Sequence, residues 1–240
     1  MQLVFDFPIN PRYSFDNFVI CDGNRLAHDF ARLLTAGGEQ NLLYIHGPQG
    51  SGKTHLLMAI GQAFHDGRPD QPIPYVSFKE LDRLYQGEYR AEQASRLAER
   101  FEGAPLLLVD DIHLIPDNPH VRVELWQLFN DFHTAGKKIA ITGLFPPREL
   151  PHLDDHLISR LLWGLVAPID VSDDDSRRLI MKKLAADRHI ILPADVIDYL
   201  LLHLPRDLPA LVSAFETVHR HALATKRKVT VKLAREALGV

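Results

Sequence analysis

A glycine-rich octapeptide constrains the fold of this chain more than any other feature. Residues 47–54 read G-P-Q-G-S-G-K-T, a complete G-x-x-x-x-G-K-[ST] pattern. The apolar run at 42–46 predicts a buried strand before it, and residues 55–60 predict the start of a helix after it. Glycines let successive backbone N–H groups turn towards phosphate oxygens at a helix N-terminus. The pattern therefore predicts an α/β fold that binds a nucleoside diphosphate or triphosphate.

Two side chains of this loop carry most of its chemistry. Lys53 is expected to reach the terminal phosphates, and the Thr54 hydroxyl is expected to hold Mg²⁺. The predicted phosphate-binding residues are Pro48, Gln49, Gly50, Ser51, Gly52, Lys53 and Thr54. The loop by itself leaves open whether the nucleotide is hydrolysed.

A second apolar run ends in two neighbouring acids. Residues 106–111 read L-L-L-V-D-D, which is what a phosphate-loop fold needs opposite its loop to complete the Mg²⁺ shell. Asp110 is expected to lie on the metal side together with Thr54. Asp111 is expected to polarise the attacking water.

Strand-like and helical patterns alternate over the first two thirds of the chain. Such alternation predicts a mainly parallel sheet covered by helices, here with five strands. The predicted strands are 42–46, 74–78, 106–110, 138–142 and 165–171. The predicted helices between them are 24–35, 55–64, 79–85, 91–101 and 121–134.

The pattern changes after residue 171, where S-D-D-D provides an N-cap cluster and no convincing strand follows. Helices are predicted at 176–186, 193–204, 206–224 and 230–238, with buried positions at Leu200, Leu201, Leu204, Leu208 and Leu211. The predicted organisation along the chain is an N-terminal peptide at 1–9, an α/β nucleotide-binding domain at 10–171 and a small all-α lid at 172–240.

Composition narrows the class of protein. A hydrophobic content of 46% supports a real core, and a formal charge of -4 gives no overall basic footprint. We therefore expect no strong sequence-specific DNA binding, and Lys226–Lys228, the compact basic cluster near the C-terminus, favours a solvated turn over a phosphate contact. With Cys21 as the single cysteine and no apolar stretch of membrane-span length, the chain is expected to be cytoplasmic, without a membrane partner.

Several further motifs carry a family resemblance. They are Y-S-F-D-N-F-V at 13–19, N-R-L-A at 24–27, V-D-D-I-H at 109–113, P-P-R-E-L at 146–150, S-R-L-L-W-G-L at 159–165 and R-D-L at 206–208. With the phosphate loop, they resemble the AAA+ domain of the bacterial replication initiator DnaA over nearly the whole chain. The resemblance implies an AAA+ fold with a helical lid that binds ADP or ATP with Mg²⁺.

The resemblance also implies roles that spacing could not show. Arg160 matches the arginine finger that completes a neighbouring subunit's active site in trans. Arg206 matches the second sensor, which reaches from the lid towards the nucleotide. The expected residues on the adenine side of the nucleotide are Phe18, Val19, Asn24 and Leu26.

One position departs from the family. The first sensor is apolar, because Leu144 stands where the family usually has a polar side chain. An apolar residue there should weaken intrinsic hydrolysis and leave phosphate binding at Lys53 and Thr54 intact. A substitute role for the nearby Thr142 stays open.

The N-terminus adds a different signal. Residues 1–7 read M-Q-L-V-F-D-F and resemble short motifs that bind the sliding clamp. In such a motif Gln2 forms a hydrogen bond on the clamp surface, and Leu3, Phe5 and Phe7 fill an apolar pocket. The alternative is a first strand packed on the protein's own core.

An initiator-like AAA+ core with such an N-terminus and without the DNA-binding domain of DnaA resembles the Hda family of DnaA-related regulators. The resemblance implies that DnaA and the β sliding clamp of DNA polymerase III are partners, that the chain self-associates, and that it stimulates hydrolysis of DnaA-bound ATP with weak or no ATPase activity of its own. The alternative is an AAA+ ATPase that loads a helicase or remodels another replication protein. A DNA-binding initiator fragment ranks last.

Overall fold

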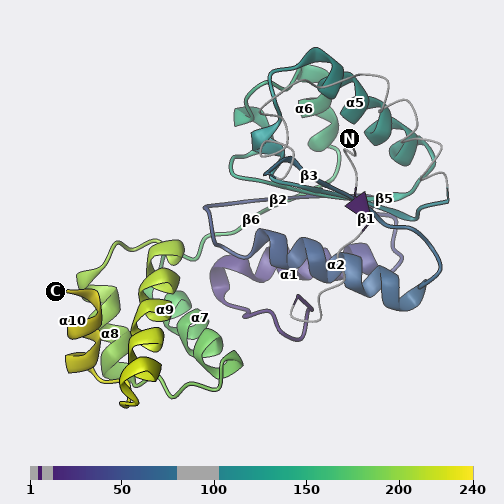
Figure 1. Cartoon of the computed structure of the whole chain (residues 1–240). Helices are drawn as coiled ribbons and strands as arrows, with labels where there is room; N and C mark the ends of the chain where they lie inside the picture. The colour runs from purple at the N-terminus through teal and green to yellow at the C-terminus, as the bar shows by residue number, and fades with distance from the viewer. Residues whose placement is uncertain (1–4, 7–12, 80–102, 240) are drawn as a thin grey trace. The chain divides into compact units, whose positions relative to one another are not determined.

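The computed structural model describes residues 5–6, 13–79 and 103–239, with backbone only at residues 5, 6 and 120. The chain divides into two compact units (Figure 1). The first unit contains residues 1–18, 24–48 and 52–169, and the second contains 19–23, 49–51 and 170–240.

A parallel sheet forms the centre of the first unit. Its strands run in the order β1-β3-β4-β5-β2-β6, and all neighbours are parallel except the edge pair β1–β3. The strands are β1 Phe5–Asp6, β2 Leu42–His46, β3 Pro74–Ser77, β4 Leu106–Asp110, β5 Lys138–Gly143 and β6 Leu165–Pro168. The five predicted parallel strands are therefore confirmed, although the last one ends at Pro168 and not at residue 171.

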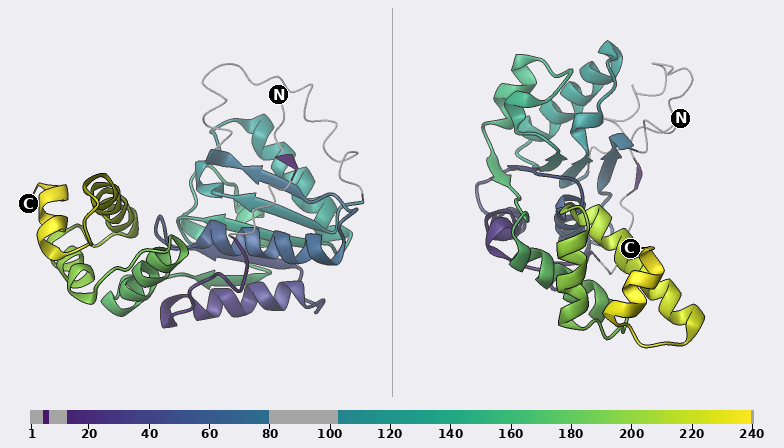
Figure 2. Two further views of the ribbon diagram at one scale, coloured as in Figure 1. Left: turned by 60° about the horizontal axis from the view of Figure 1, so that its bottom comes forward. Right: turned by 90° about the vertical axis from the view of Figure 1, so that its left-hand side faces the viewer.

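Helices cover both faces of this sheet, which explains why its strands are mostly apolar. Helices α1 Asp22–Thr35 and α2 Lys53–Gly67 lie on one face, and α5 Pro119–Thr134 and α6 Asp155–Leu161 on the other (Figures 1 and 2). All five residues of β4 are buried, as expected for a strand that is covered on both sides. Two short 3₁₀ helices, η2 Ile112–Leu114 and η3 Pro147–Glu149, follow β4 and β5.

Helix α5 shows how the sequence pattern produces this packing. Its buried residues recur at helical spacing, on one face that packs against the sheet, and are Val121, Leu125, Leu128, Phe129 and Phe132. They join Tyr44 and Phe78 in one apolar cluster. Burial of each large side chain contributes roughly 1.5–3 kcal/mol relative to exposure.

Helix α6 was not predicted from the sequence. Only seven residues long, it begins after Asp154, whose carboxylate accepts a hydrogen bond from the Leu157 N–H at 2.9 Å. A helix this short offers too few turns for a clear apolar period. The helices predicted at 79–85 and 91–101 lie outside the described residues, apart from residue 79.

The second unit is helical after residue 170, as predicted. Its helices are α7 Asp174–Asp187, α8 Ala194–His203, α9 Leu208–Thr225 and α10 Val231–Leu238. Side chains of Asp173, Asp207 and Thr230 cap α7, α9 and α10. Four of the five predicted core leucines are buried, and Leu204 is half-buried. Among the described residues, no helix has both the length and the apolarity needed to cross a membrane.

Candidate nucleotide site and arginine surface

The phosphate loop has a backbone that requires glycine. Gly50 and Gly52 have φ values of 78° and 100°, in the left-handed region. A Cβ atom on Gly52 would also lie 2.9 Å from a ring carbon of Phe18. Gly52 is the residue before α2, and it offers no side chain to cap that helix. The first N–H groups of α2 therefore stay available for an anion, as at other phosphate-binding helix ends.

Lys53 folds back onto this loop. Its ammonium group is buried and donates hydrogen bonds of 2.8 Å to the carbonyl oxygens of Gly47 and Pro48. Burial lowers the pKa of Lys53, and the nearby charges of Asp111 and Asp110 oppose that shift. The side chain is thus held at the loop, where phosphate oxygens would give it charged partners.

The Ser51 hydroxyl supplies a second indication of an anion. Its oxygen is buried and has no hydrogen-bond partner among the residues that the structure describes. Buried hydroxyls of this kind are costly unless a ligand or water satisfies them. A phosphate oxygen at the loop would satisfy it, so the residues present fit a nucleotide.

Asp110 lies at the centre of a hydroxyl cluster. Thr54 donates to its two carboxylate oxygens at 3.2 and 3.0 Å, and Tyr75 donates to one of them at 3.2 Å. Thr142 provides the third hydroxyl that donates to this carboxylate. A threonine hydroxyl beside a carboxylate fits the few protein ligands that Mg²⁺ takes beside phosphate and water. The structure thus brings Thr54 and Asp110 together, the two residues predicted to hold the metal.

Burial and the Asp111 charge raise the pKa of Asp110, whereas hydrogen bonds from Thr142, Thr54 and Tyr75 lower it. Burial has the largest effect. The metal-free carboxylate is therefore an energetic cost to the fold, and a cation at this position would remove that cost.

The replacement of Asp110 by asparagine is expected to stabilise the metal-free protein. Because the pKa of Asp110 is raised by folding, the folded state binds its proton more tightly, and stability falls as pH rises from the ordinary pKa to the raised one. Asp110→Asn removes this loss, so its thermal midpoint at pH 7.5 without Mg²⁺ should exceed that of wild type by about 2–4 °C, the shift that ~1 kcal/mol produces in a chain of this size.

The control for this prediction is the dependence on pH and metal. The difference between the two midpoints should shrink as pH falls towards the ordinary pKa of an aspartate. Addition of Mg²⁺ with ADP should stabilise wild type more than Asp110→Asn. A variant that melts lower than wild type at both pH values would contradict the prediction.

Thr142 connects the two acids. Besides its bond to Asp110, its hydroxyl oxygen accepts a hydrogen bond of 3.0 Å from the backbone N–H of Asp111. Asp111, directly after β4, has a left-handed φ of 54° and a half-buried side chain. Leu144 is half-buried, and the hydroxyl at this strand end comes from Thr142.

Sequence reasoning missed Tyr75. Its position in the middle of β3 looks like an ordinary buried strand residue, and only the pairing of β3 with β4 brings its hydroxyl to Asp110. No local motif could have marked it.

The predicted base-side residues differ in exposure. Phe18 is half-buried, and its ring stacks on His28 at 5.9 Å and meets the His55 ring edge-on at 5.2 Å. Asn24 is buried and Val19 half-buried, whereas Leu26 is 47% exposed. Phe18 lies beside the phosphate loop, through its approach to Gly52.

Arg160 lies on α6 in a group of side chains that we call the arginine surface: Trp126, Asn130, Arg160 and Trp163. The Arg160 guanidinium donates a hydrogen bond of 2.9 Å to Asn130 and lies over the rings of Trp126 and Trp163, at 5.1 and 6.0 Å. Trp163 is 63% exposed. In the described part of the chain Arg160 forms no ion pair, so a planar cation is held in place without a carboxylate partner.

Two further predicted sites are the second sensor at Arg206 and the clamp-binding peptide at the N-terminus. Arg206 is an exposed residue of the second unit, directly before the α9 cap, and its sensor role stays a prediction. Phe5 pairs with Tyr75 through the backbone, as the alternative of an N-terminal strand on the protein's own sheet would require. Gln2, Leu3 and Phe7 lie outside the described residues, so clamp binding also stays a prediction.

Comparisons with known proteins agree with this geometry. The family model of the bacterial DnaA ATPase domain matches residues 9–168, and that of the Hda lid domain matches residues 174–238. The chromosomal replication initiator DnaA of Limosilactobacillus reuteri is 32% identical over 235 residues, which are 97% of this chain and 53% of that protein. The chain thus spans about half the length of the curated relatives it matches.

Solved structures give the same result. Domain III of the Thermotoga maritima initiator DnaA superimposes with a TM-score of 0.84 at 30% identity, over 97% of this chain and 98% of that one. AMPPCP-bound DnaA from Aquifex aeolicus gives 0.73 at 25% identity, over 88% and 66%. The chain therefore belongs to the bacterial DnaA ATPase-domain family, and it joins that AAA+ domain to a lid of the Hda type.

Proposed function

We propose that this protein is a nucleotide-bound relative of DnaA that switches the initiator off. In this proposal it associates with the β sliding clamp of DNA polymerase III and stimulates hydrolysis of the ATP held by DnaA. The match of residues 174–238 to the Hda lid supports a regulator over an initiator. The observation that carries the proposal is Arg160, a cation without a carboxylate partner in the described chain.

The nucleotide is ADP or ATP with Mg²⁺. Support comes from the AMPPCP-bound Aquifex aeolicus relative and from the buried Lys53, the buried Ser51 hydroxyl and the Thr54–Asp110 pair. Lys53 would bind terminal phosphate oxygens in place of its two carbonyl partners. Thr54 and Asp110 would hold the Mg²⁺, which neutralises phosphate charge when bound.

Arg160 would act outside its own subunit. A guanidinium group offsets the negative charge that develops on a transferring phosphoryl group, and such fingers are worth roughly 10³ to 10⁵ in rate. The two tryptophans and Asn130 limit the rotamers of Arg160, so its side chain would lose little conformational entropy when DnaA binds. The exposed Trp163 would join the same contact, since partly exposed tryptophans next to arginine are typical of interface anchors.

Weak intrinsic hydrolysis fits the same proposal. The Thr142 hydroxyl is engaged by Asp110 and by the Asp111 N–H, and Leu144 offers no polar group to position water. The protein would then keep its own nucleotide bound, and Arg160 would complete the active site of DnaA in trans.

The alternative is an AAA+ ATPase that loads a helicase or remodels a replication protein. Thr142 favours it, because a hydroxyl that contacts both acids is a candidate to replace the missing polar sensor. Brisk ATP hydrolysis by the purified protein alone would support this alternative.

A hydrolysis assay tests the proposal. Turnover of ATP by cognate DnaA is followed with the clamp loaded on DNA, in the presence and absence of this protein. Stimulation that needs the clamp establishes the regulator. Unchanged DnaA turnover, with ATP hydrolysis by the added protein, rejects it.

The N-terminal peptide gives a separate prediction. Gln2→Ala with Leu3→Ala should weaken binding to the immobilised clamp by about tenfold or more, because interface anchors of this kind carry most of the affinity. The thermal midpoint should not change. If clamp binding persists and the midpoint falls, these residues belong to the protein's own fold, next to the Phe5–Tyr75 pairing.

A further inference from the structure

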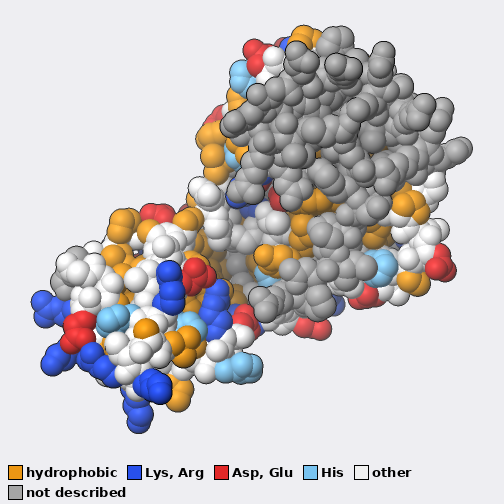
Figure 3. Space-filling view, viewed as in Figure 1, with side chains coloured by type: hydrophobic (Ala, Val, Ile, Leu, Met, Phe, Trp, Pro, Cys, Tyr) orange, Lys and Arg blue, Asp and Glu red, His pale blue; other side chains and the backbone are white. Residues whose placement is uncertain are grey.

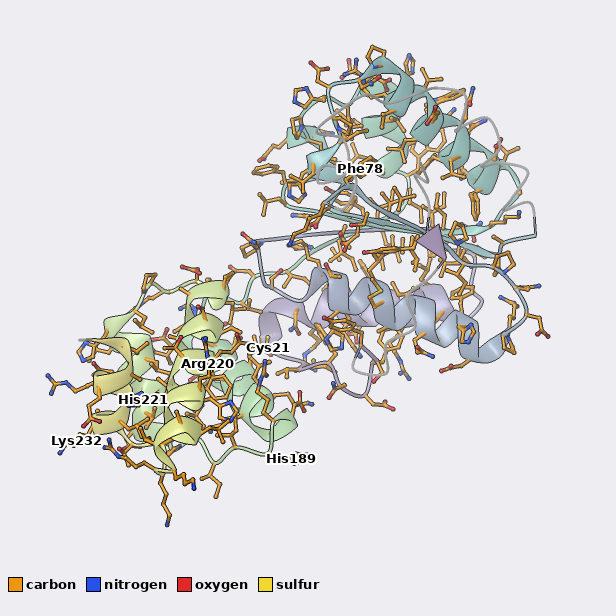
Figure 4. The ribbon with its side chains drawn as sticks, in the orientation of Figure 1. Cys21, Phe78, His189, Arg220, His221 and Lys232 are labelled. Atoms are coloured by element: carbon orange, nitrogen blue, oxygen red, sulfur yellow. The ribbon has the colours of Figure 1, made fainter. Side chains whose placement is uncertain are left out.

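One stretch of the helical unit has several basic side chains and no acidic one. Residues 217–235 contain no Asp or Glu but six Lys or Arg side chains. Five exposed cations at the end of α9, in the following turn and on α10 form what we call the basic surface: Lys226, Arg227, Lys228, Lys232 and Arg235. In Figure 3 Lys and Arg side chains crowd the lower left edge of this unit, and Figure 4 marks Lys232 on α10.

Two of these cations, Arg227 and Lys232, interact with one carboxylate, that of Glu236. Arg227 forms an ion pair of 2.6 Å with Glu236. The hydrogen bond from Arg227 lowers the pKa of Glu236 most, and the charges of Arg227, Lys232 and His221 lower it further. Residues from α9, the turn and α10 therefore lie close together around Glu236. Among the described residues, Lys226, Lys228, Lys232 and Arg235 form no ion pair.

The contrast with α7 shows that this is not a general property of the unit. On and just after α7, Arg177 pairs with Asp174, Arg178 with Asp175 and Asp198, Lys183 with Asp187, and Arg188 with Glu216. The cations of α7 are thus mostly neutralised internally. Those of the basic surface are not, so their field is directed at the solvent.

Among these five cations, Arg235 lies in the last turn of α10, where the helix dipole favours a positive charge. The folded helices gain little from the other four. A cation stabilises the last turn of a helix, but the last turn of α9 carries none, and Arg227 and Lys228 lie beyond the helix end. Lys228 lies two residues before the Thr230 cap and Lys232 lies in the first turn of α10, where the helix dipole disfavours cations. Lys226 has a left-handed φ of 53°, a conformation that glycine adopts at lower cost. A solvated turn would not need lysine at these positions.

We propose that the basic surface binds the phosphate backbone of DNA without sequence preference. Several cations on an exposed turn and helix match successive phosphates better than one small anion, which needs a concave site. Within residues 217–235 the one large apolar side chain that is strongly exposed is Leu223, and such a polar, positive surface is typical of nucleic-acid contacts. The inference uses residues of the helical unit alone and does not depend on the proposed function.

Salt-dependent binding to a labelled 30-base-pair duplex tests the inference. Each phosphate contact contributes about 0.9 to the slope of log affinity against log salt. Lys228→Gln with Lys232→Gln should lower that slope by about two and weaken binding about tenfold near 0.1 M salt. The control is Lys79→Gln with Lys182→Gln, which removes two exposed lysine charges elsewhere and should leave both values close to wild type. A single strand of the same length distinguishes duplex from single-stranded DNA as the source of the phosphates.

A second variant separates binding from folding. Lys226→Gly relieves the left-handed backbone, so it should keep or raise the thermal midpoint while it weakens duplex binding. A lower midpoint with unchanged DNA affinity would show that Lys226 serves the fold and would overturn the inference. Equal DNA affinity of the Lys228→Gln/Lys232→Gln variant and the Lys79→Gln/Lys182→Gln control would also overturn the inference. Binding of polyglutamate as tightly as DNA would overturn it in favour of an acidic protein partner.

Discussion

Replacement of Arg160 by alanine is expected to abolish stimulation of DnaA, with a loss of about 10³-fold or more in the stimulated rate of ATP hydrolysis. The size follows from the chemistry, because no other group replaces a guanidinium that contacts the transition state in trans. The fold should persist, since the variant loses one hydrogen bond and two cation–π contacts of a half-buried guanidinium, together worth about 1.5–3.5 kcal/mol.

Arg68→Ala is the matched control. Arg68 is an exposed arginine that lies over the Phe64 ring at 5.7 Å, beyond the end of α2, so its removal costs a similar aromatic contact without touching the arginine surface. It should keep full stimulation. Arg160→Lys should restore little activity, because lysine keeps the charge and loses the planar group held by Asn130 and the tryptophans. Full stimulation by Arg160→Ala, at wild-type clamp affinity, would falsify the role of Arg160.

Replacement of Lys53 by methionine is expected to reduce the affinity for ADP by about 100-fold or more. The two charge-assisted hydrogen bonds from the ammonium group to phosphate would be lost, at about 1.5–3 kcal/mol each. The nucleotide-free variant should fold, because burial already lowers the pKa of Lys53 and methionine fills a similar volume without a buried charge.

Equilibrium titration with a fluorescent ADP analogue measures this effect. Lys182→Met, an exposed lysine on α7, is the control and should bind ADP as wild type does. Since the proposed regulator acts in its nucleotide-bound form, Lys53→Met should also fail to stimulate DnaA. Wild-type ADP affinity in Lys53→Met would show that this loop is not the nucleotide site.

Local pattern was sufficient for most elements of this fold. Continuous apolar runs predicted the parallel strands, because strands buried on both faces have no polar positions. Asp173, Asp207 and Thr230 cap helices whose starts were predicted within two residues. The seven-residue α6 escaped prediction because it is too short to show a helical period. The two-residue β1 was predicted only as the alternative to a clamp-binding peptide, because its pairing with β3 is a long-range contact.

The sequence by itself determined the phosphate loop, the paired acids and the succession of strands and helices along the chain, because each depends on neighbours within a few residues. Only the tertiary structure decided which hydroxyls meet Asp110. Tyr75 and Thr142 reach it from the two strands that flank β4, and the order of the strands across the sheet is not encoded in any local period. The same holds for Arg160, whose Asn130 and Trp126 partners come from α5, a separate helix on the same face of the sheet. Side chains that are far apart in sequence meet only when the sheet and its covering helices have been assembled.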